Sequence, residues 1–517
     1  MKELDFHRSF LPAVDRWADK VAIHDGDYHA TFGQHGDRVL RLADALHAEL
    51  GLERGDRFAV MSANSHQFLE LYHAGFLGGG VINPLNLRLA GKELQFILAD
   101  SGAEVAFVDG IFAPVIEAVR EEAGLEHVVR IGLGDVPHTA TYEELLATAD
   151  PAIPHEGDET DPVVLMYTGG TTGRAKGALL DQRAEILNLY HIAMTVGFSD
   201  ERVYLHQTPM FHAASMGAIL GLVVTGGRSV FAPFFEPAEV MALIERYQVD
   251  WTMMVPTMIA MVFDHPEFRP ERLASLRDLV YGGSPMPAGL LDKVMALLPH
   301  TGLWEGYGMT ECSSVLTFLT DVDHRVGGPR LRSAGRPVVG VTISIFDGDD
   351  HPVPDGHDGE VCARAGNLMQ RYWNRPEETA AAFRRDWYHT GDVGHVDADG
   401  YVYLVDRLND MIVTGGENVY SVEVENALST HPAVEQVAVI GIPHPTWGEQ
   451  VHAIVVVRPG FEVSTRELQD HALRTVANYK VPKSIEFRDE DLPLSGALKI
   501  LKQNLRAPFW DKQGTAG

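Results

Sequence analysis

VVLMYTGGTTGRAKGALL, the stretch from Val163 to Leu180, sets two apolar segments on either side of a turn rich in glycine and threonine. The first segment, Val163 to Tyr167, predicts a short buried strand, and the residues after Gly177 predict a second strand or buried segment. Backbone N–H groups and hydroxyls in such a turn hold anions, and Lys176 adds a charge that suits phosphate. No Walker A register fits the turn. A surface hairpin turn without a ligand is the alternative.

The composition of the chain is that of a globular, acidic protein. Its 517 residues are enough for two to four domains, and 42 basic against 72 acidic residues give a net charge of −30. Such a surface repels nucleic acid and anionic membrane, so local positive groups must attract an anionic ligand. The first ten residues lack a signal core, and no apolar run reaches the ~18 residues of a membrane span. We therefore expect a cytoplasmic protein without nucleic-acid partners.

The two cysteines, Cys312 and Cys362, are too few for a disulfide framework, which points to a reducing compartment. Their spacing is not that of a metal site. Cys312 has no local partner that would make it a nucleophile, so a packed neutral thiol is expected.

The order of helical and strand-like segments predicts an α/β fold. A helix is expected at Arg38–Leu50 and strands at Arg57–Met61 and Glu104–Val108, an alternation typical of α/β domains. From Val341 the pattern becomes β-rich, with a hairpin signal at Asp399–Gly400. The expected fold class is a large N-terminal α/β domain with a β-rich subdomain, followed by a small α+β domain.

A new αβ pattern follows Asp406, where we place the domain boundary. Residues 1–405 would form the N-terminal domain and residues 406–517 the C-terminal one, a size within the usual range. Ser421 is expected to cap the first helix of the second domain.

The turn also carries a resemblance. YTGGTTGRAKG is similar to the YTSGTTGxPKG phosphate loop of the adenylate-forming enzymes, a superfamily of acyl- and aryl-CoA ligases, luciferases and peptide-synthetase adenylation domains. Two positions depart: Gly169 replaces serine and removes a hydroxyl, and Ala175 replaces proline and loosens the turn. The resemblance covers nearly the whole chain, with its motifs in family order. It implies a C-terminal domain that moves between two half-reactions, with Asp406 as the hinge.

Two further motifs supply nucleotide contacts. In GYGMTE, Tyr307 offers an aromatic face to a purine, Thr310 can donate to a phosphate, and Glu311 offers a hard oxygen to Mg²⁺. This resembles the family YGxTE motif. In YHTGDV, Asp392 can accept both hydroxyl hydrogen bonds of a ribose, as in the family TGD motif. The resemblance also assigns Arg407 to the nucleotide.

The acyl group and the catalytic lysine are assigned mainly by resemblance. PMFHAAS matches a family PxFH motif, which places His212 between the acyl group and the incoming thiol; a satisfied core histidine is the alternative. LPLSGALKILK resembles LPRTPTGKILK, so Lys499 aligns with the catalytic lysine. Ala497 and Leu498 replace threonine and glycine there, which questions the efficiency of adenylation. A surface lysine is the alternative.

Together these motifs assign four groups of residues. The catalytic residues are Lys499, Thr310, Glu311 and His212. The ATP-binding residues are Thr168, Gly169, Gly170, Thr171, Thr172, Gly173, Lys176, Gly283, Ser284, Glu305, Gly306, Tyr307, Gly308, Thr310, Asp392, Arg407 and Lys499, with Glu311 and Thr172 at magnesium. The acyl pocket comprises His212, Ala213, Met216, Tyr281, Gly282, Gly308 and Ser313. The CoA-binding residues are Gly415, Gly416, Glu417, Trp447 and Arg88, of which Trp447 and Arg88 are as readily structural or solvated.

The resemblance implies that a carboxylic acid, fatty or aryl, ATP and coenzyme A give acyl-CoA, AMP and pyrophosphate through an acyl-adenylate with Mg²⁺. Three alternatives remain: an adenylation enzyme that serves a carrier protein, a luciferase-like oxidising enzyme, and a nucleotide-binding homologue without catalysis. No sequence feature sets the oligomeric state, and a homodimer is one option.

Overall fold

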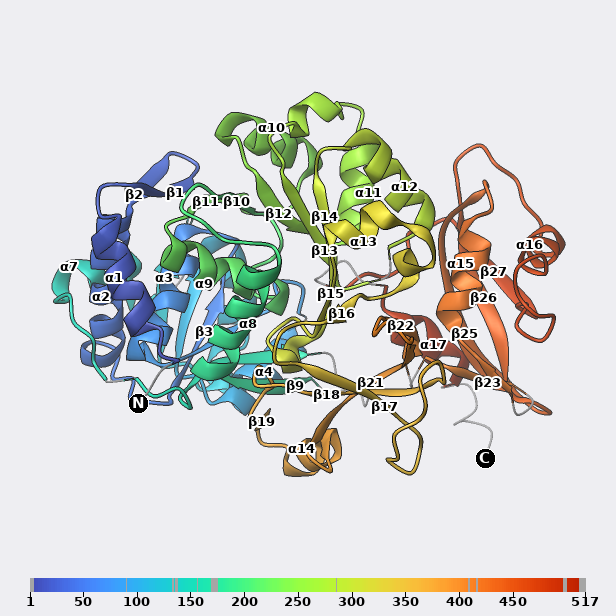
Figure 1. Cartoon of the computed structure of the whole chain (residues 1–517). Coiled ribbons are helices and arrows are strands. Elements are labelled where there is room, and N and C mark those ends of the chain that lie inside the picture. Colours follow the sequence, from blue (N-terminus) through green and yellow to red (C-terminus); the bar gives the residue numbers. More distant parts are fainter. Residues whose placement is uncertain are drawn as a thin grey trace. The chain divides into compact units, whose positions relative to one another are not determined.

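The computed structural model describes residues 4–89, 91–132, 134, 138–155, 157–168, 175–284, 286–407, 410–414, 417–495 and 500–510, without the side chains of residues 406, 407, 417 and 418. The chain divides into two compact units, each described below by itself (Figure 1). Unit 1 comprises Met1–Pro285, Val294–Thr342 and Arg364–Tyr388. Unit 2 comprises Met286–Lys293, Ile343–Ala363 and His389–Gly517.

The described residues of unit 1 form two large, mainly parallel sheets. The first has the order β19 (Arg371–Tyr372), β9 (Lys176–Asp181), β8 (Pro162–Thr168), β4 (Val81–Pro84), β3 (Arg57–Met61), β5 (Val105–Asp109), β6 (His127–Ile131), β7 (Ala140–Thr141). The second has the order β16 (Arg336–Pro337), β15 (Thr317–Leu319), β14 (Gly302–Tyr307), β13 (Asp278–Gly282), β12 (Trp251–Met254), β10 (Val203–His206), β11 (Arg228–Phe231), β1 (Val21–Asp25), β2 (Tyr28–Thr31). Antiparallel pairs occur at the edges, where β8 meets β9, β9 meets β19, β14 meets β15, β15 meets β16, and β1 meets β2.

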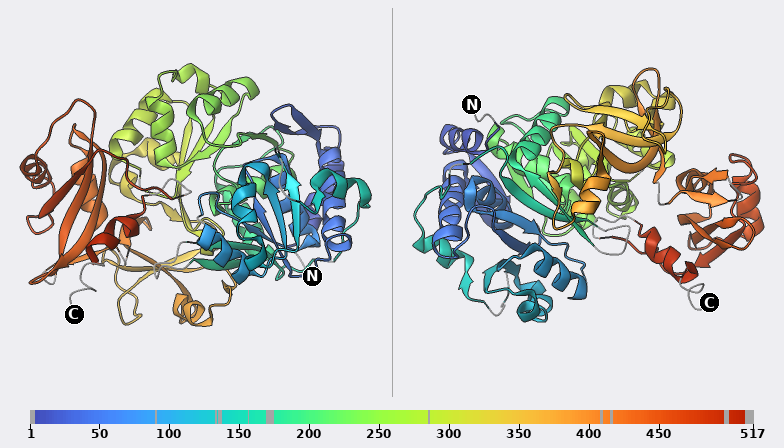
Figure 2. Two further views of the ribbon diagram at one scale, coloured as in Figure 1. Left: turned by 180° about the vertical axis from the view of Figure 1, so that it is seen from behind. Right: turned by 90° about the horizontal axis from the view of Figure 1, so that it is seen from below.

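Helices connect and cover these strands, as Figure 2 shows from behind and from below. The α-helices of unit 1 are α1 (His7–Arg16), α2 (Phe32–Ala48), α3 (His66–Ala74), α4 (Gly91–Ser101), α5 (Ala113–Glu117), α6 (Arg120–Ala123), α7 (Tyr142–Thr148), α8 (Gln182–Thr195), α9 (Met216–Thr225), α10 (Pro237–Tyr247), α11 (Pro256–Asp264), α13 (Asp321–Val326) and α14 (Pro376–Ala382). Helix α12 (Ala288–Leu297) crosses the division of the chain. Shorter helical turns are η1 (Gly75–Gly79), η2 (Gly110–Phe112), η3 (Ala213–Ser215), η4 (Pro270–Leu273), η5 (Thr310–Cys312) and η6 (Gly328–Arg332).

Local sequence explains where the early helices begin. Thr31 and Gln34 form a reciprocal capping box, so α2 starts at Phe32 and not at the predicted Arg38. Ser65 caps α3, and the chain then widens into the π-type turn η1, where Gly78 adopts a φ of +95°. Glycine accepts this left-handed conformation without steric cost.

The largest hydrophobic core packs α2, α3, α8 and α9 with residues of both sheets. Its fully buried members include Phe32, Phe58, Phe68, Phe76, Phe107, Ile82, Val164, Leu220 and Phe231. Each buried side chain of this size stabilises the fold by about 1.5–3 kcal/mol.

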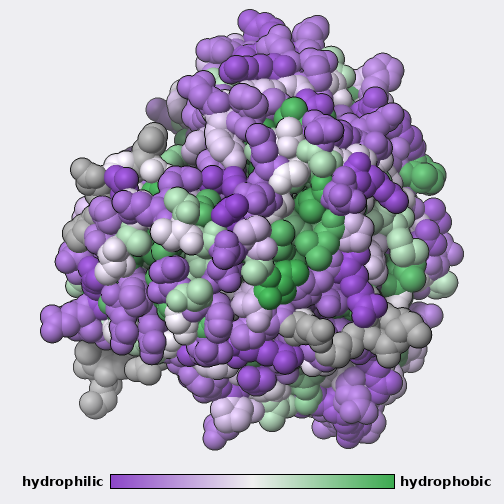
Figure 3. Space-filling model, turned by 90° about the vertical axis from the view of Figure 1, so that its left-hand side faces the viewer, coloured by the Kyte–Doolittle hydropathy of each residue, from purple (hydrophilic) through white to green (hydrophobic). Residues whose placement is uncertain are grey.

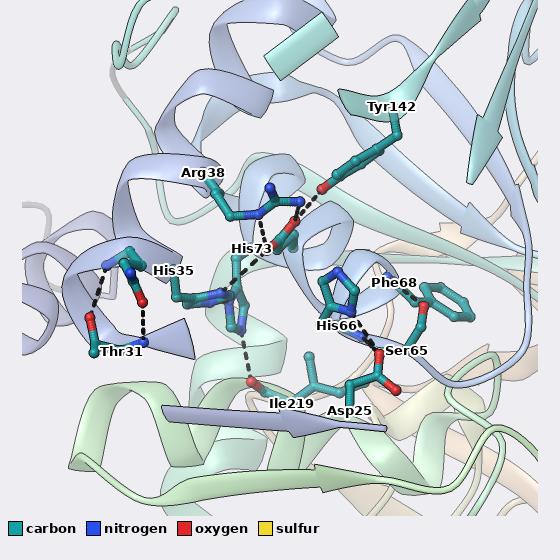
Figure 4. A network of polar contacts seen from close by, with 12 residues as sticks. Asp25, Thr31, His35, Arg38, Ser65, His66, Phe68, His73, Tyr142 and Ile219 are labelled. Atoms are coloured by element: carbon teal, nitrogen blue, oxygen red, sulfur yellow. Dashed lines mark hydrogen bonds and ion pairs between the residues drawn. The ribbon is translucent and has the colours of Figure 1, made fainter. Parts of the chain in front are cut away.

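A polar network crosses this core (Figure 4). His73 Nε2 lies 2.8 Å from the carbonyl oxygen of Ile219 on α9, and His73 Nδ1 lies 2.8 Å from His35 Nε2 on α2. The carboxylate of Glu70 accepts from Arg38 Nε at 2.8 Å and from the Tyr142 hydroxyl at 2.5 Å. Because burial lowers the pKa of His73 to about 4, its ring is neutral at pH 7.

The side-chain amide of Asn64 connects loops at the ends of both large sheets. Asn64 follows β3, and its Nδ2 donates to the carbonyl oxygens of His206, Thr208 and Ala232 at 3.1–3.3 Å. Its Oδ1 accepts from Met210 N at 2.8 Å. A buried side chain with every bond satisfied in this way fixes the loop positions after β3, β10 and β11.

Two smaller sheets follow the large ones. One has the order β17 (Thr342–Phe346), β18 (Gly359–Arg364), β21 (Trp387–Val396), β20 (Phe383–Arg384), with β22 (Val402–Arg407) beside β21. The other has the order β24 (Glu417–Val419), β23 (Ile412–Thr414), β26 (Gly448–Val457), β25 (Val434–His444), with β27 (Ser484–Arg488) beside β26. Helices α15 (Ser421–Ser429), α16 (Thr465–Ala472) and α17 (Lys502–Trp510) accompany the second sheet.

These elements test several predictions. The hairpin at Asp399–Gly400 is confirmed, since β21 and β22 pair antiparallel and Gly400 has a φ of +84°. The predicted cap at Ser421 is wrong: Tyr420 occupies the N-cap position, and the Ser421 hydroxyl instead accepts from Lys502 Nζ at 2.6 Å.

Hydrophilic side chains predominate on the face seen in Figure 3, with apolar residues in small groups. Within the described part of the chain, no helix has both the length and the apolar character needed to cross a membrane.

Candidate active site

The glycine motifs lie at the carboxyl ends of two neighbouring parallel strands. β13 and β14 pair with Gly282 opposite Gly306. A Cβ on Gly282 would stand 2.2 Å from the carbonyl oxygen of Gly306, and one on Gly308 would stand 2.2 Å from that of Ser314. Both positions therefore need glycine because protein backbone lies against them. In α/β folds ligands bind at this end of the strands.

Thr310 and Glu311 form the short turn η5 directly after β14, and each is only 9% exposed. Glu311 Oε1 accepts a hydrogen bond of 2.8 Å from the hydroxyl of Tyr372, and its backbone oxygen accepts from Met369 N. A buried carboxylate needs such partners. The bond leaves the second oxygen of Glu311 available, and carboxylate oxygen is a preferred donor for Mg²⁺.

The turn after Glu311 has an unusual backbone. Ser313 and Ser314 have φ values of +56° and +127°, which non-glycine residues seldom adopt. The Ser313 hydroxyl donates to the carbonyl of Asn367, and that of Ser314 to Asn188 Oδ1 on α8. Burial raises the pKa of Glu185, one turn earlier on α8, well above its usual range. The bonds of the two serine hydroxyls hold the strained turn in place.

Lys176 is brought to the same region by the first sheet. It begins β9, pairs with Thr168 on β8, and sets its Nζ 5.3 Å from the centroid of the Tyr372 ring. Tyr372 lies on β19, which pairs with β9. One tyrosine thus contacts the lysine expected at phosphate and the carboxylate expected at magnesium. Residues 169–174 of the loop, between Thr168 and Lys176, lie outside the described residues. They include the predicted ATP-binding residues Gly169, Gly170, Thr171, Thr172 and Gly173.

Hydrogen bonds link His324, Tyr281 and Glu305 in a row. His324 Nδ1 lies 2.8 Å from the carbonyl oxygen of Thr320, so it carries the hydrogen, and Nε2 accepts from the Tyr281 hydroxyl at 2.7 Å. That hydroxyl also lies 3.3 Å from Glu305 Oε2. Burial raises the pKa of Glu305 to about 8, so its carboxyl is protonated at neutral pH. The protonated carboxyl can donate to the Tyr281 hydroxyl, whose own hydrogen goes to His324.

The residues expected at the acyl group are mostly buried. Ala213, Met216, Tyr281 and Ser313 are at most 2% exposed, whereas His212 is half-buried. His212 Nδ1 accepts from Ala214 N at 3.3 Å at the start of η3. Gly283 has a φ of +80°, and Ser284 follows it after β13.

Asp392 lies in unit 2 on strand β21, where the neighbouring strand β18 holds the backbone. The Thr390 hydroxyl donates to the Val361 carbonyl at 2.7 Å and accepts from Asp392 N at 3.1 Å. Glu360 Oε1 accepts from Gly391 N at 3.2 Å. The backbone of Asp392 pairs with that of Arg407 across β21 and β22, which puts both predicted nucleotide residues at one register position.

The predicted CoA and C-terminal residues are only partly described. Trp447 is 42% exposed and stacks on His444 at a centroid distance of 4.2 Å. Exposed Arg88 in unit 1 donates its backbone N–H to Asn86 Oδ1. Gly415, Gly416 and Lys499 lie outside the described residues, as do the side chains of Asp406, Arg407 and Glu417.

Sequence reasoning did not find Tyr372, Glu185 or Asn188. Tyr372 stands 61 positions from Glu311 in the chain, and Asn188 is 126 positions from Ser314. Only a buried polar row at helical spacing on α8, Glu185, Asn188 and His191, was available as a signal.

Comparison with known proteins assigns the chain. The model for "AMP-binding enzyme" matches residues 10–373, and that for "AMP-binding enzyme C-terminal domain" matches residues 423–499. The chain belongs to the AMP-binding enzyme family. Its fold is therefore that of the adenylate-forming superfamily, a large N-terminal α/β domain followed by a small C-terminal domain, as predicted. The domain boundary at Asp406 stays a prediction.

Similar proteins of this family are acid ligases. The chain is 38% identical over 494 residues to a feruloyl-CoA synthase of Amycolatopsis sp, covering 95% of this chain and 96% of that protein. It is 35% identical over 474 residues to a fatty acid–[acyl-carrier-protein] ligase of Streptomyces coeruleorubidus, covering 91% and 90%. This AMP-binding enzyme is thus a member of the AMP-forming acid–CoA ligases, and its substrate is open.

A solved structure of this family holds the nucleotide. The o-succinylbenzoate coenzyme A synthetase of Bacillus subtilis, in complex with ATP and magnesium ion, has a TM-score of 0.84 and 29% identity, covering 96% of this chain and 98% of that one. The prediction that this AMP-binding enzyme is a ligase of the adenylate-forming type is confirmed.

Proposed function

We propose that this enzyme is an ATP-dependent carboxylic acid–CoA ligase that acts through an acyl-adenylate. The observation that carries the proposal is Tyr372, whose ring lies 5.3 Å from Lys176 Nζ and whose hydroxyl donates to Glu311 at 2.8 Å. Tyr372 therefore contacts both Lys176, the cation proposed for phosphate, and Glu311, the carboxylate proposed for the metal. The 38% identity with a feruloyl-CoA synthase gives the same reaction class.

In the first step a carboxylate oxygen of the acid bonds to the α-phosphorus of ATP, and the bond from phosphorus to pyrophosphate breaks. In the second step the thiol sulfur of CoA bonds to the acyl carbon, the thiol loses its proton, and AMP leaves. Negative charge grows at phosphorus in the first step, and positive or N–H groups lower its energy. Lys176, Thr310 and Lys499 have this role in the proposal.

The magnesium ion and the ribose have expected partners. Glu311 and Thr172 would hold Mg²⁺, which neutralises phosphate charge when bound. The buried Glu311 carboxylate, already oriented by Tyr372, fits a hard cation. Asp392 would accept the ribose hydroxyls, and the bond from its backbone N–H to the Thr390 hydroxyl fixes the strand position from which its carboxylate extends.

For the acid we propose a fatty or aryl chain. The feruloyl-CoA synthase acts on an aryl acid, and the relative from Streptomyces coeruleorubidus is named for a fatty acid. The half-buried His212 would separate the acyl group from the thiol, beside apolar Ala213 and Met216. CoA is the proposed acceptor, and the second relative keeps a carrier protein as the alternative.

The test is a panel of aryl and fatty acids with MgATP and either CoA or a holo-carrier protein. Pyrophosphate release matched by acyl-CoA formation is expected for at least one acid. Pyrophosphate release with loading of the carrier only would favour the alternative, and no release with any acid would contradict the proposal.

The two half-reactions separate the role of Lys499. In Lys499→Ala, pyrophosphate formation should fall about 10²–10³-fold, the effect of losing one charge-stabilising donor. Thioester formation from pre-made acyl-adenylate should continue, because no charge of that kind develops at phosphorus. Equal slowing of both steps would show that Lys499 is structural and that Asp406 is not a hinge between two catalytic states.

A further inference from the structure

Three side chains of types that can bind a metal meet in unit 2, and none of them is a predicted magnesium ligand. Glu360 and Cys362 lie two residues apart on β18 and so share one face of the strand, and His389 lies on the neighbouring strand β21 (Figure 1). One ligand atom from each lies within 4.8 Å of the others. His389 Nδ1 is 3.2 Å from Cys362 Sγ and 2.8 Å from Glu360 Oε2.

The three side chains lie in a largely buried environment. Cys362 is fully buried, and the side chains of His389 and Glu360 are 3% and 16% exposed. The ring of Phe346 on β17 lies 6.0 Å from that of His389. A thiol, an imidazole and a carboxylate converge where little water reaches them, and Glu360 is the most exposed of the three.

A second partner holds Glu360, and a carboxylate lies near the other nitrogen of His389. His389 Nε2 faces Asp350 Oδ1 at 3.9 Å, on the side of the ring opposite Cys362. Glu360 Oε1 accepts from Gly391 N at 3.2 Å while Oε2 faces the histidine. Metal-bound histidines commonly direct their other nitrogen to a carboxylate, and ligating carboxylates commonly keep such hydrogen bonds.

We propose that Glu360, Cys362 and His389 bind one thiophilic divalent cation of the Zn²⁺ type. Sulfur, nitrogen and oxygen at ~2.3, ~2.0 and ~2.1 Å from a tetrahedral Zn²⁺ stand about 3.3–3.6 Å apart, so the contacts of 2.8 and 3.2 Å must widen by about 0.6 and about 0.3 Å. Binding releases the thiol proton and leaves the imidazole proton on Nε2, toward Asp350. The remaining coordination position is left to water at the Glu360 side.

A bound ion also links two strands. Through Glu360 and Cys362 on β18 and His389 on β21, it joins these strands three residues before Asp392. The site does not rest on the proposed function, and its test needs no turnover.

The experiment titrates the metal-free full-length chain with Co²⁺, which reports thiolate ligation as a charge-transfer absorption in the near ultraviolet. One equivalent should produce this absorption and tetrahedral visible bands, and Zn²⁺ should abolish both. Cys362→Ser should lose the charge-transfer absorption, while Cys312→Ser, at the other buried cysteine, should retain it. A wild-type chain without the absorption, or Cys362→Ser with it, would overturn the proposal.

Affinity and melting temperature provide a second readout. Asp350→Asn should weaken Co²⁺ binding about 10–100-fold, the usual effect of losing a ligand's outer partner. Zn²⁺ should raise the melting temperature of the wild-type chain but not of Cys362→Ser. The group His47, Glu53 and His155 in unit 1 has no sulfur, so cobalt bound there gives no thiolate absorption. If Cys362→Ser does not fold, the wild-type spectrum and Cys362→Ala decide the question.

Discussion

Replacement of Tyr372 by phenylalanine isolates one hydroxyl of the candidate site. Phenylalanine keeps the ring under Lys176 Nζ, 5.3 Å from its centroid, and removes the hydroxyl that donates to Glu311 at 2.8 Å and also contacts the hydroxyl of Tyr388. A hydrogen bond to a charged group contributes about 1.5–3 kcal/mol. Since ~1.4 kcal/mol is tenfold, the loss of this orientation should lower kcat/KM for MgATP about 10- to 100-fold.

The assay is pyrophosphate release at saturating acid over a Mg²⁺ titration. The Tyr372→Phe enzyme should need more Mg²⁺ for half-maximal rate, with an unchanged KM for the acid, because the hydroxyl acts on the predicted metal ligand. Tyr372→Leu also removes the ring, whose attraction for an ammonium is about 0.5–2 kcal/mol, so it should further raise the KM for ATP through Lys176.

Tyr142→Phe is the matched control. It too loses a tyrosine–carboxylate bond, to Glu70 at 2.5 Å in the core network, and should lower the melting temperature without altering the Mg²⁺ dependence. The reasoning is refuted if Tyr372→Phe stays within twofold of the wild type across the titration, or if Tyr142→Phe changes the Mg²⁺ dependence equally.

Three further predictions concern stability. The pKa of buried His73 is about 4 in the folded state against 6.5 in the unfolded state, so the unfolded state binds more protons below pH 6.5. Lowering the pH from 7.5 to 5 should therefore reduce the free energy of unfolding by about 2 kcal/mol. In chemical unfolding, His73→Gln should make this difference smaller. The pKa of Glu305 rises from 4.5 to about 8 on folding, so its stabilisation is lost as pH rises through 8, and Glu305→Gln should flatten the melting temperature between pH 7 and 9. Gly308→Ala should destabilise by about 1–3 kcal/mol in thermal melts because its Cβ meets the Ser314 carbonyl at 2.2 Å, whereas Gly289→Ala, in open space on α12, should be neutral or stabilising.

Local patterns predicted the elements that depend on local causes. The strand expected at Arg57–Met61 has those bounds, because a short apolar run, Phe58 to Met61, lies between the turn residues Gly55–Asp56 and Ser62–Asn64. The helix expected from Arg38 begins six residues earlier, since the capping box of Thr31 and Gln34 was not recognised. Ser421 failed as a cap because Lys502, 81 positions away, takes its hydroxyl.

The residues of the candidate site also fall into two groups, those identified by local motifs and those brought in by distant strand pairing. Thr310, Glu311 and Lys176 were found because each stands in a short motif of the right order. Tyr372 could not be found, because its role arises only when β19 pairs with β9, nearly 200 positions earlier in the chain. A two-residue strand has too little pattern to predict its partner.

The way β1 joins its sheet has a consequence for synthesis on the ribosome. β1 ends at Asp25, but its parallel partner β11 begins at Arg228, about 200 residues later. At roughly 5–20 residues per second, translation takes about 10–40 s to deliver that partner. During this interval the first sheet can assemble around β3, whereas β1 and β2 have only each other, and an isolated hairpin is marginally stable. We therefore expect β1 and β2 to need chaperone protection until β11 is made, and slower decoding between residues 31 and 228 to prolong that need.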